Sequence, residues 1–193
     1  MPRCGLDCAS VVSAAAQLAD SDGLDKLTLA RLADRLGVRA PSLYGHVDGL
    51  ADLRARVGVH GVVQMTAALS AAAAGRAGQD ALQAVADAYR QFAHAHPGVY
   101  AAMQRAPENL GSDAAAAATR LVEVFVAVLR GYGLQDNEAI HGVRLVRSAL
   151  HGFIALESDQ GFGMPISPEE TYQRLIAMLD HGLRAPKSKD QSQ

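Results

Sequence analysis

The sequence predicts an all-α protein of about nine helices. Apolar residues recur at steps of three and four along most of the 193 residues, and no segment alternates apolar and polar residues long enough to form a strand. Glycine, proline and short polar residues separate these apolar segments at helix lengths. With 49% hydrophobic and 20% charged residues, the composition is typical of a folded globular protein.

The first part of the chain predicts two consecutive helices. Residues 6–21 are rich in Ala, Val and Leu, and Gly23 follows them as a C-terminal stop. Thr28 offers a side-chain cap for a second helix over 29–36, whose apolar residues recur at i, i+3, i+4 and i+7. Gly37 then ends this amphipathic stripe.

A very short helix and a very long one come next. Pro41 suits the first turn of the short helix, because its missing N–H would have no partner there. A segment this short is marginal as an isolated helix, so its neighbours must hold it. The long helix is predicted over 49–73, where ~1.5 Å per residue gives roughly 40 Å.

The second half predicts five further helices. Ser167, Pro168 and Glu170 are a capping box for the last helix, which ends near Gly182. Apolar residues that recur at intervals of three and four predict the other four helices over 82–96, 97–103, 113–130 and 136–158.

The stretch GVRAPSLYGHV, residues 37–47, has the layout of a helix-turn-helix. Val38, Leu43 and Val47 are spaced to pack back onto the preceding helices, which leaves the start and outer face of the short helix free. In a helix-turn-helix this second helix enters the major groove of DNA with its N-terminal residues on base edges. Two short helices joined by a Gly turn also occur in other bundles, where Tyr44 would simply be half-buried.

The side chains left free suit DNA. Arg39 can donate two hydrogen bonds to guanine, Ser42 can bond a base or a phosphate, and Ala40 or Pro41 can touch a thymine methyl group. Phosphate oxygens can accept hydrogen bonds from Tyr and His side chains, which fix register on the duplex. The candidate DNA-binding residues are Thr28, Arg39, Ala40, Pro41, Ser42, Tyr44, Gly45 and His46.

Two runs carry a resemblance to a known family. GLDKLTLARLADRLGVRAPSLYGHVDGLADL, residues 23–53, resembles the DNA-binding domain of the TetR family of bacterial transcriptional regulators. RSALHGFIALESDQGFGMP, residues 147–165, resembles the ligand-binding domain of a TetR subgroup named for a Trp-His-Gly motif, with Leu150 in place of the Trp. The resemblance, which extends over residues 6–184, implies a homodimer joined through the last two long helices as a four-helix bundle. It also implies an effector pocket whose occupation releases operator DNA.

We therefore expect a helix-turn-helix domain over 1–48, an α-helical ligand-binding and dimerisation domain over 49–184 and a disordered tail over 185–193. The first domain is not basic overall, because residues 1–57 carry seven basic and seven acidic side chains. Asp48 also follows the short helix where many relatives carry Lys or Arg. Affinity from phosphate neutralisation should accordingly be modest.

Aromatic and Met side chains at helical spacing are candidates for the lining of an effector pocket, although the same spacing is typical of plain core. We expect a small apolar or amphipathic effector. The candidate effector-binding residues are Met65, Leu69, Tyr89, Phe92, Met103, Phe125, Arg144 and His151.

One predicted helix carries a polar stripe, in which His141, Arg144, Ser148 and His151 step by three, four and three and so share a face. This stripe could line an effector cavity, pair across a dimer or be ordinary hydrogen-bonded residues at a subunit seam. Neighbouring small residues would let a partner helix approach closely. The candidate dimer residues are Ser148, Ala149, Gly152, Ala155, Tyr172, Leu175, Ile176 and Leu179.

Several classes of protein do not fit the sequence. Nothing resembles a nucleophile with its base, a carboxylate pair or a phosphate loop, so we expect no enzyme. No apolar run approaches the ~20 residues of a membrane span, and no secretory signal is evident, which favours a cytoplasmic protein. Cys4 with Cys8, and His94 with His96, make poor metal pairs, so we expect no metal and no cofactor.

Two functions of different classes remain. The first is a repressor that binds a palindromic double-stranded operator as a homodimer and is released by a small molecule. The alternative is an all-α small-molecule binding protein with weak or no DNA binding, which the acidic residue at Asp48 supports. Two positive ridges on the dimer, one or more duplex turns apart, would favour the first.

Overall fold

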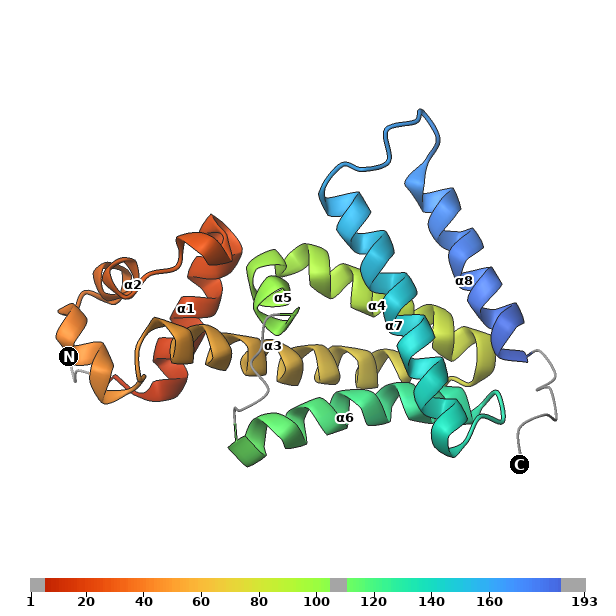
Figure 1. The fold of residues 1–193 in the computed structure, drawn as a ribbon, viewed down its shortest axis with the longest axis horizontal. Coiled ribbons are helices and arrows are strands. Elements are labelled where there is room, and N and C mark those ends of the chain that lie inside the picture. Colours follow the sequence, from red (N-terminus) through yellow and green to blue (C-terminus); the bar gives the residue numbers. More distant parts are fainter. Residues whose placement is uncertain (1–5, 105–110, 185–193) are drawn as a thin grey trace, which may run out of the picture. The chain divides into compact units, whose positions relative to one another are not determined.

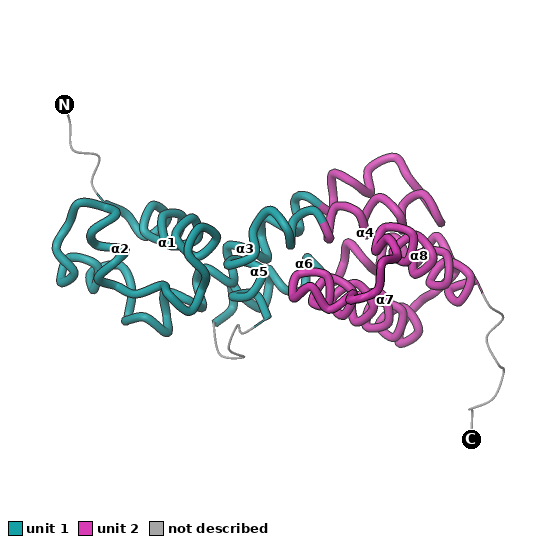
Figure 2. The backbone as a smooth tube through the Cα atoms, turned by 90° about the horizontal axis from the view of Figure 1, so that it is seen from above, with its two compact units in different colours: residues 1–68, 91–121 teal, residues 69–90, 122–193 magenta. Residues whose placement is uncertain are grey.

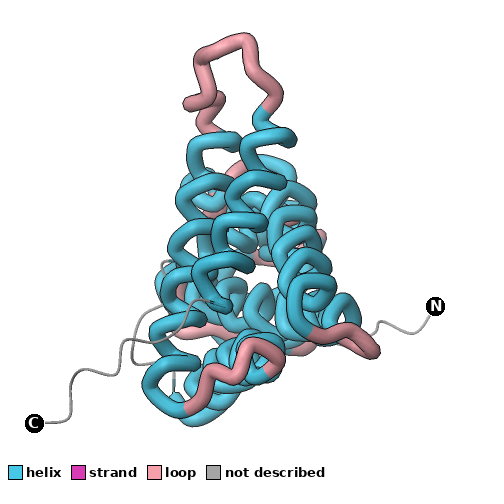
Figure 3. Tube along the Cα trace, turned by 90° about the vertical axis from the view of Figure 1, so that its right-hand side faces the viewer, coloured by secondary structure: helices cyan, strands magenta, loops and turns pink. Residues whose placement is uncertain are grey.

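The computed structural model describes residues 6–104 and 111–184, so the tail predicted at 185–193 lies outside the described residues. Within these ranges the chain forms only helices (Figure 1) joined by loops and turns (Figure 3), which confirms the all-α fold class. The elements are α1 Cys8–Asp22, η1 Leu24–Lys26, α2 Leu29–Leu36, η2 Ala40–Gly45, α3 Leu50–Ala73, α4 Gly78–Ala95, α5 Pro97–Gln104, α6 Gly111–Arg130, α7 Asp136–Ser158 and α8 Pro168–Arg184, where η marks a 3-10 helix.

Most helix bounds lie within two residues of the sequence signals, and two helices begin earlier than predicted. α4 begins at Gly78 rather than at 82, and α6 begins at Gly111 rather than at 113. Both helices start with a polar turn, which carries no apolar stripe to reveal it. The short second helix of the helix-turn-helix layout is present, but η2 is a 3-10 helix and not an α-helix.

The described helices gather in two compact units (Figure 2). Unit 1 comprises residues 1–68 and 91–121, and unit 2 comprises residues 69–90 and 122–193. The unit boundaries fall inside α3, α4 and α6. These units differ from the division at residue 48, because α5 packs against α1 and so joins the N-terminal helices. The division at residue 48 by function stays a prediction.

A leucine core holds η2 in unit 1. Leu27, Leu32, Leu43 and Leu53 have no exposed surface, and Val47 is almost as buried. Full burial of such a side chain contributes about 1.5–3 kcal/mol of hydrophobic stabilisation. The predicted packing of the short helix onto its neighbours is therefore confirmed, and it explains why six residues hold a helical conformation.

Unit 2 has its own core, made by α4, α6, α7 and α8. The rings of Tyr89 and Phe125 meet edge to face with centroids 6.3 Å apart, and Phe153 lies against Tyr172 at 5.3 Å. Gly142 lets α7 approach α6, since a Cβ there would lie 2.9 Å from a methyl group of Leu129.

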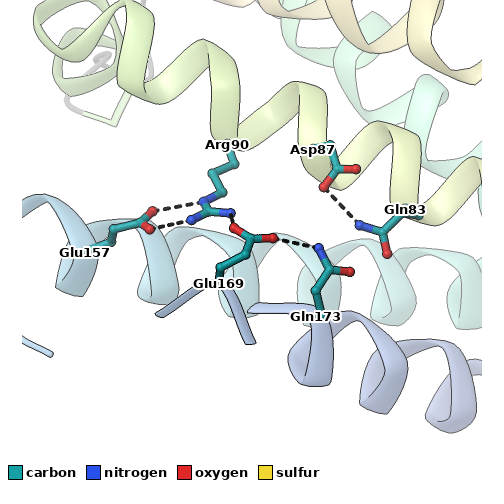
Figure 4. A network of polar contacts seen from close by, with 6 residues as sticks. All are labelled: Gln83, Asp87, Arg90, Glu157, Glu169 and Gln173. Carbon is teal, nitrogen blue, oxygen red and sulfur yellow. Dashed lines mark hydrogen bonds and ion pairs between the residues drawn. The ribbon is translucent and has the colours of Figure 1, made fainter. Parts of the chain in front are cut away.

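Arg90 of α4 fastens the end of α7 and the start of α8 in unit 2 (Figure 4). Its guanidinium donates to both oxygens of Glu157, at 3.0 and 2.5 Å, and to Glu169 at 2.6 Å. The guanidinium also lies 4.4 Å from the ring centroid of Tyr172. Hydrogen bonds to Glu157, with those to Glu169, raise the pKa of Arg90 despite partial burial.

Candidate nucleic-acid interface

Local backbone chemistry sets the turn between α2 and η2. Thr28 Oγ1 accepts the N–H of Arg31 at 3.2 Å and caps the first turn of α2. At the other end Gly37 has a φ of 66°, a left-handed conformation that glycine adopts without strain. The N–H of Val38 then returns to the carbonyl of Ala33 at 3.0 Å. These bonds fix the direction in which the chain leaves α2.

The period of η2 decides which side chains face outward, because every third residue of a 3-10 helix shares a side. Leu43 is fully buried. Ala40 and His46, three positions before and after Leu43, share its side and are half-buried. Tyr44 is 61% exposed. We call the exposed residues the outer face of η2; they are Arg39, Pro41, Ser42, Tyr44 and Gly45.

The structure brings most of the candidate DNA-binding residues together on this outer face. Three of them lie elsewhere: Ala40 and His46 share the side of Leu43, and the Thr28 hydroxyl caps α2, as the sequence also predicted. The sequence suggested an outward His46 because α-helical spacing was assumed there, whereas a 3-10 helix turns it inward. The Thr28 O–H can still donate to another group.

Other arginines of unit 1 are committed to structural bonds, and sequence reasoning missed them. Arg31 of α2 pairs with Asp22 of α1. Arg54 of α3 lies 3.3 Å from three backbone carbonyls in the segment before α2. By contrast, Arg39 makes no such bond within the described residues, so its guanidinium is available to an external ligand. No spacing rule reveals the Arg54 contacts, whose partners are 27 to 30 residues away.

Acidic groups follow the outer face directly in the chain. The N–H of Asp48 donates to the carboxylate of Asp52 at 2.9 Å, and Arg56 donates to the same carboxylate at 2.8 Å. Burial tends to raise the pKa of Asp52, but the hydrogen bonds outweigh it and the pKa lies below its ordinary value. Asp52 is therefore ionised at neutral pH. Its negative charge reduces the net positive charge of the region that follows the outer face.

The candidate effector residues lie in both units. In unit 1, Met65 and Phe92 are buried, and Met103 is half-buried close to Gly61 of α3. In unit 2, Leu69, Tyr89 and Phe125 are buried, and only the Tyr89 and Phe125 rings are brought into the contact described above.

The polar stripe of α7 lies on the surface of unit 2. His141, Arg144 and Ser148 are exposed and His151 is half-buried. Because α7 turns that side away from the core of its unit, Arg144 lies on the surface of the single chain, and its role in an effector cavity stays a prediction. A surface hollow of about 260 Å³ exists elsewhere in unit 2 and contains none of the candidate effector residues; it is lined by Gly161, Phe162, Gly163, Met164, Ile166, Pro168 and Thr171.

The candidate dimer residues divide into two groups. Ser148 and Gly152 are exposed on α7, Ala149 and Ala155 are half-buried beside them, and Leu175 and Leu179 are half-buried on α8. Tyr172 and Ile176 instead lie in the core of their own unit, with 0% and 1% exposed. Because their own unit already buries these two side chains in the single chain, the packing of unit 2 accounts for them; their place at a dimer interface stays a prediction. Sequence reasoning missed three exposed apolar side chains, Leu145, Leu156 and Met178, which are 64%, 51% and 71% exposed.

Residues 6–104 and 111–184 contain no helix that is both long and apolar enough to cross a bilayer. The same residues contain no group of three or more His, Cys, Asp and Glu side chains that could hold a metal ion.

Comparison with known families gives two matches. A model described as bacterial regulatory proteins of the tetR family matches residues 11–59. A second model, described as a tetracyclin repressor-like C-terminal domain, matches residues 82–179. Together they span the outer face of η2 and most of unit 2.

Two curated relatives are similar over most of their length. An uncharacterized HTH-type transcriptional regulator of Mycobacterium tuberculosis is 42% identical over 90% of this chain and 80% of the relative. A second uncharacterized HTH-type transcriptional regulator, from Bacillus subtilis, is 34% identical over 83% of this chain and 84% of the relative.

Solved structures share the fold. A protein of unknown function from Rhodococcus superposes with a TM-score of 0.79 at 21% identity, over 96% of this chain and 100% of the other. TetR from Acinetobacter baumannii superposes with a TM-score of 0.69 at 21% identity, over 94% and 100% of the two chains. Apo ActR from Streptomyces coelicolor gives a TM-score of 0.72 at 20% identity, over 95% and 97%.

Proposed function

The chain belongs to the TetR family of bacterial transcriptional regulators, and from this premise we propose that it represses transcription as a ligand-released homodimer in the cytoplasm. Members of the family are regulators and not enzymes; they carry a helix-turn-helix DNA-binding domain, and they dimerise. The observation that carries the proposal is the outer face of η2, where Arg39 has no bonded partner among the described residues and Tyr44 is exposed above a tightly packed leucine core.

The outer face supplies two kinds of DNA contact. A guanidinium can donate two hydrogen bonds to guanine O6 and N7, which reads a base pair, and Arg39 is placed for this at the start of η2. The hydroxyl groups of Ser42 and Tyr44 can donate to phosphate oxygens, which sets register. In a dimer the two outer faces read half-sites about 34–36 Å apart, or a multiple of this, so the operator is palindromic.

The dimer is proposed to form through α7 and α8. Leu145 and Leu156 of α7 and Met178 of α8 are exposed apolar side chains, which association would remove from water. Gly152 and Ser148 between them are small, so that a partner helix can approach closely. The polar stripe around His141 then lies at the subunit seam.

The effector is proposed to be a small apolar or amphipathic molecule that binds in unit 2 beside Tyr89 and Phe125. Such a ligand releases the operator only if it binds the DNA-free conformation more tightly than the DNA-bound one. Phe125→Ala should then abolish the rise in melting temperature that a bound ligand produces, whereas Glu123→Ala, at an exposed position of the same helix α6, should retain it.

The experiment is selection of DNA fragments by the purified protein, followed by sequencing. The proposal requires an enriched palindrome. Arg39→Ala should then relax preference at particular base pairs, with effects of about 1–3 kcal/mol per pair, whereas Tyr44→Phe should weaken all sequences alike. Enrichment of no sequence would contradict the proposal.

The charge balance favours a second candidate, an all-α protein that sequesters a small molecule. Its supporting observation is the commitment of Arg31 and Arg54 to structural bonds and the presence of Asp48 and Asp52 after the outer face. This candidate predicts ligand binding with no DNA enriched in the same selection.

A further inference from the structure

Unit 1 contains a polar contact between α1 and α5 that includes no residue of the outer face. Asp20, near the C-terminal end of α1, accepts the backbone N–H of Val99 at 2.8 Å and lies 2.9 Å from Nδ1 of His96. His96 stands directly before α5, and Val99 lies in the first turn of α5. The Asp20 side chain is 19% exposed and the His96 side chain is 42% exposed, so the contact is shielded from water mainly on the side of Asp20.

Asp20 caps α5 from another helix. The first N–H groups of a helix have no partner within it, and that end carries a partial positive charge. The carboxylate of Asp20 satisfies one of these groups and places a negative charge at the favourable end. The ring of Phe92, 4.9 Å from that of His96, lies against the imidazole in this contact.

Close backbone packing also holds α5 against α1, and we call this contact the α1–α5 joint. Gly98 of α5 lies so near the end of α1 that a Cβ there would be 2.0 Å from the carbonyl oxygen of Ala19. On the side of α3, a Cβ at Gly61 would lie 2.4 Å from Val99. α5 is therefore held against both α1 and α3 within unit 1.

A continuous series of contacts leads from this joint to the outer face. α1 is bound to α2 by the pair Asp22–Arg31 and by Arg35, which donates to Gln17 at 3.1 Å. α2 in turn contacts η2, whose Leu43 is fully buried. Each link lies in unit 1.

We infer that Asp20 is a positioning residue for DNA binding. By holding α5 against α1, it fixes α1, α2 and η2 in the arrangement that presents Arg39 to DNA. The inference rests on the proposed DNA-binding function. His96 is the single residue between α4 and α5, so the end of α4 that lies in unit 1 is joined directly to the contact with Asp20.

The direction in which DNA affinity changes distinguishes a positioning role of Asp20 from an effect of its charge alone. Removal of a carboxylate makes a protein less repulsive to a polyanion and should tighten DNA binding. Loss of a positioning contact should weaken it. Asp20→Asn tests both, because it removes the charge in an isosteric side chain, and Gly98→Ala opens the joint by a steric clash with no change of charge.

The experiment measures the affinity of the full chain for the DNA fragment that the wild type selects. Asp20→Asn and Gly98→Ala should each weaken binding by about five- to tenfold. Asp113→Asn is the matched control, because it removes the same charge from an exposed position of unit 1 and should leave affinity unchanged or slightly tighter. All measurements are made at a temperature at which circular dichroism shows every variant folded.

Hydrogen exchange gives a second test, because a residue that only stabilises the fold would not make the exchange rate of the Val99 N–H depend on DNA. If docking of α5 favours DNA binding, DNA binding must favour docking by the same factor. Exchange of the Val99 N–H should therefore slow when the wild type binds its DNA, and should slow less in Asp20→Asn.

Three outcomes overturn the inference. The first is a lowered melting temperature with unchanged DNA affinity in Asp20→Asn and Gly98→Ala, which would make the joint a matter of stability alone. The second is a Val99 exchange rate that DNA leaves unchanged. The third, a wild type that selects no DNA, overturns the proposed function and this inference with it.

Discussion

The carboxylate of Asp180 holds α8 to the turn between α6 and α7. Tyr132 donates its O–H to Asp180 at 2.6 Å, and Arg184 donates to both carboxylate oxygens at 2.9 to 3.1 Å. Hydrogen bonds from Arg184, which outweigh the effect of burial, hold the pKa of Asp180 below its ordinary value.

This lowered pKa sets the pH dependence of a variant. A carboxylate whose pKa falls on folding stabilises the folded state above its unfolded pKa, near 4, and loses that contribution as pH falls through the folded value. Asp180→Asn should therefore lower the free energy of unfolding at pH 7, and the difference from wild type should close below about pH 4. Urea unfolding at several pH values measures it; a difference that is constant with pH would contradict the assignment.

Single residues were predictable where their partners are close in the chain. The Thr28 cap follows from its place three residues before Arg31, and the structure has that bond. The contacts of Arg90 could not be predicted, because Glu157 and Glu169 are 67 and 79 residues away. Only the packing of unit 2 brings these groups together.

At the scale of elements, η2 is attached to the leucine core through one of its own side chains. Leu43 is fully buried, so Leu43→Ala should cost about 2–5 kcal/mol of stability and abolish selective DNA binding. Tyr44→Ala is the matched control, because Tyr44 is exposed; it should change stability by no more than about 0.5 kcal/mol while still weakening DNA binding. Chemical denaturation measures both. Equal stability losses in the two variants would refute the packing argument.

α7 offers a variant that separates folding from assembly. A Cβ at Gly152 would meet no atom within 4 Å in the single chain. Gly152→Leu should therefore raise helix stability by up to about 1 kcal/mol while it weakens dimerisation. Sedimentation measures assembly and thermal unfolding measures stability. A variant dimer as tight as the wild type would place the subunit contact elsewhere.

The type of each long element was predictable from apolar spacing, but the side that each buries was less so. Leu43 and Val47 face inward as the spacing suggested. His46 is half-buried and not outward as predicted, because a 3-10 helix has three residues per turn and His46 comes three residues after the buried Leu43. Tyr172 fits a dimer stripe equally well by spacing, and only the three-dimensional packing shows that its own unit buries it.

At the scale of the whole molecule, the charge balance predicts a shallow salt dependence of DNA binding. Each phosphate that a protein neutralises contributes about −0.9 to the slope of log K against log salt. With most arginines near the outer face bonded internally, fewer than about six phosphates should be neutralised per dimer, which gives a slope shallower than about −5. Titrations between 50 and 200 mM salt measure it. A slope near −9 would show that structural arginines also reach DNA.

The fold class and the family resemblance followed from the sequence because helix spacing and the run around η2 are local signals. The grouping into units could not be predicted in this way. It depends on contacts such as that of Gly98 with Ala19, which join segments 79 residues apart. No local rule distinguishes such a glycine from one in a loop.

The three unit boundaries inside α3, α4 and α6 have a consequence for how the chain folds. A helix is cooperative along its length, so melting one half removes support from the other. Neither unit is a continuous segment, so neither can be excised as a fragment that folds alone, and chimeras cut at residue 48 would interrupt the tertiary contacts of unit 1. We expect calorimetry to show one transition with equal calorimetric and van't Hoff enthalpies. The ribosome, too, must release the chain as far as residue 121, inside α6, before unit 1 is complete.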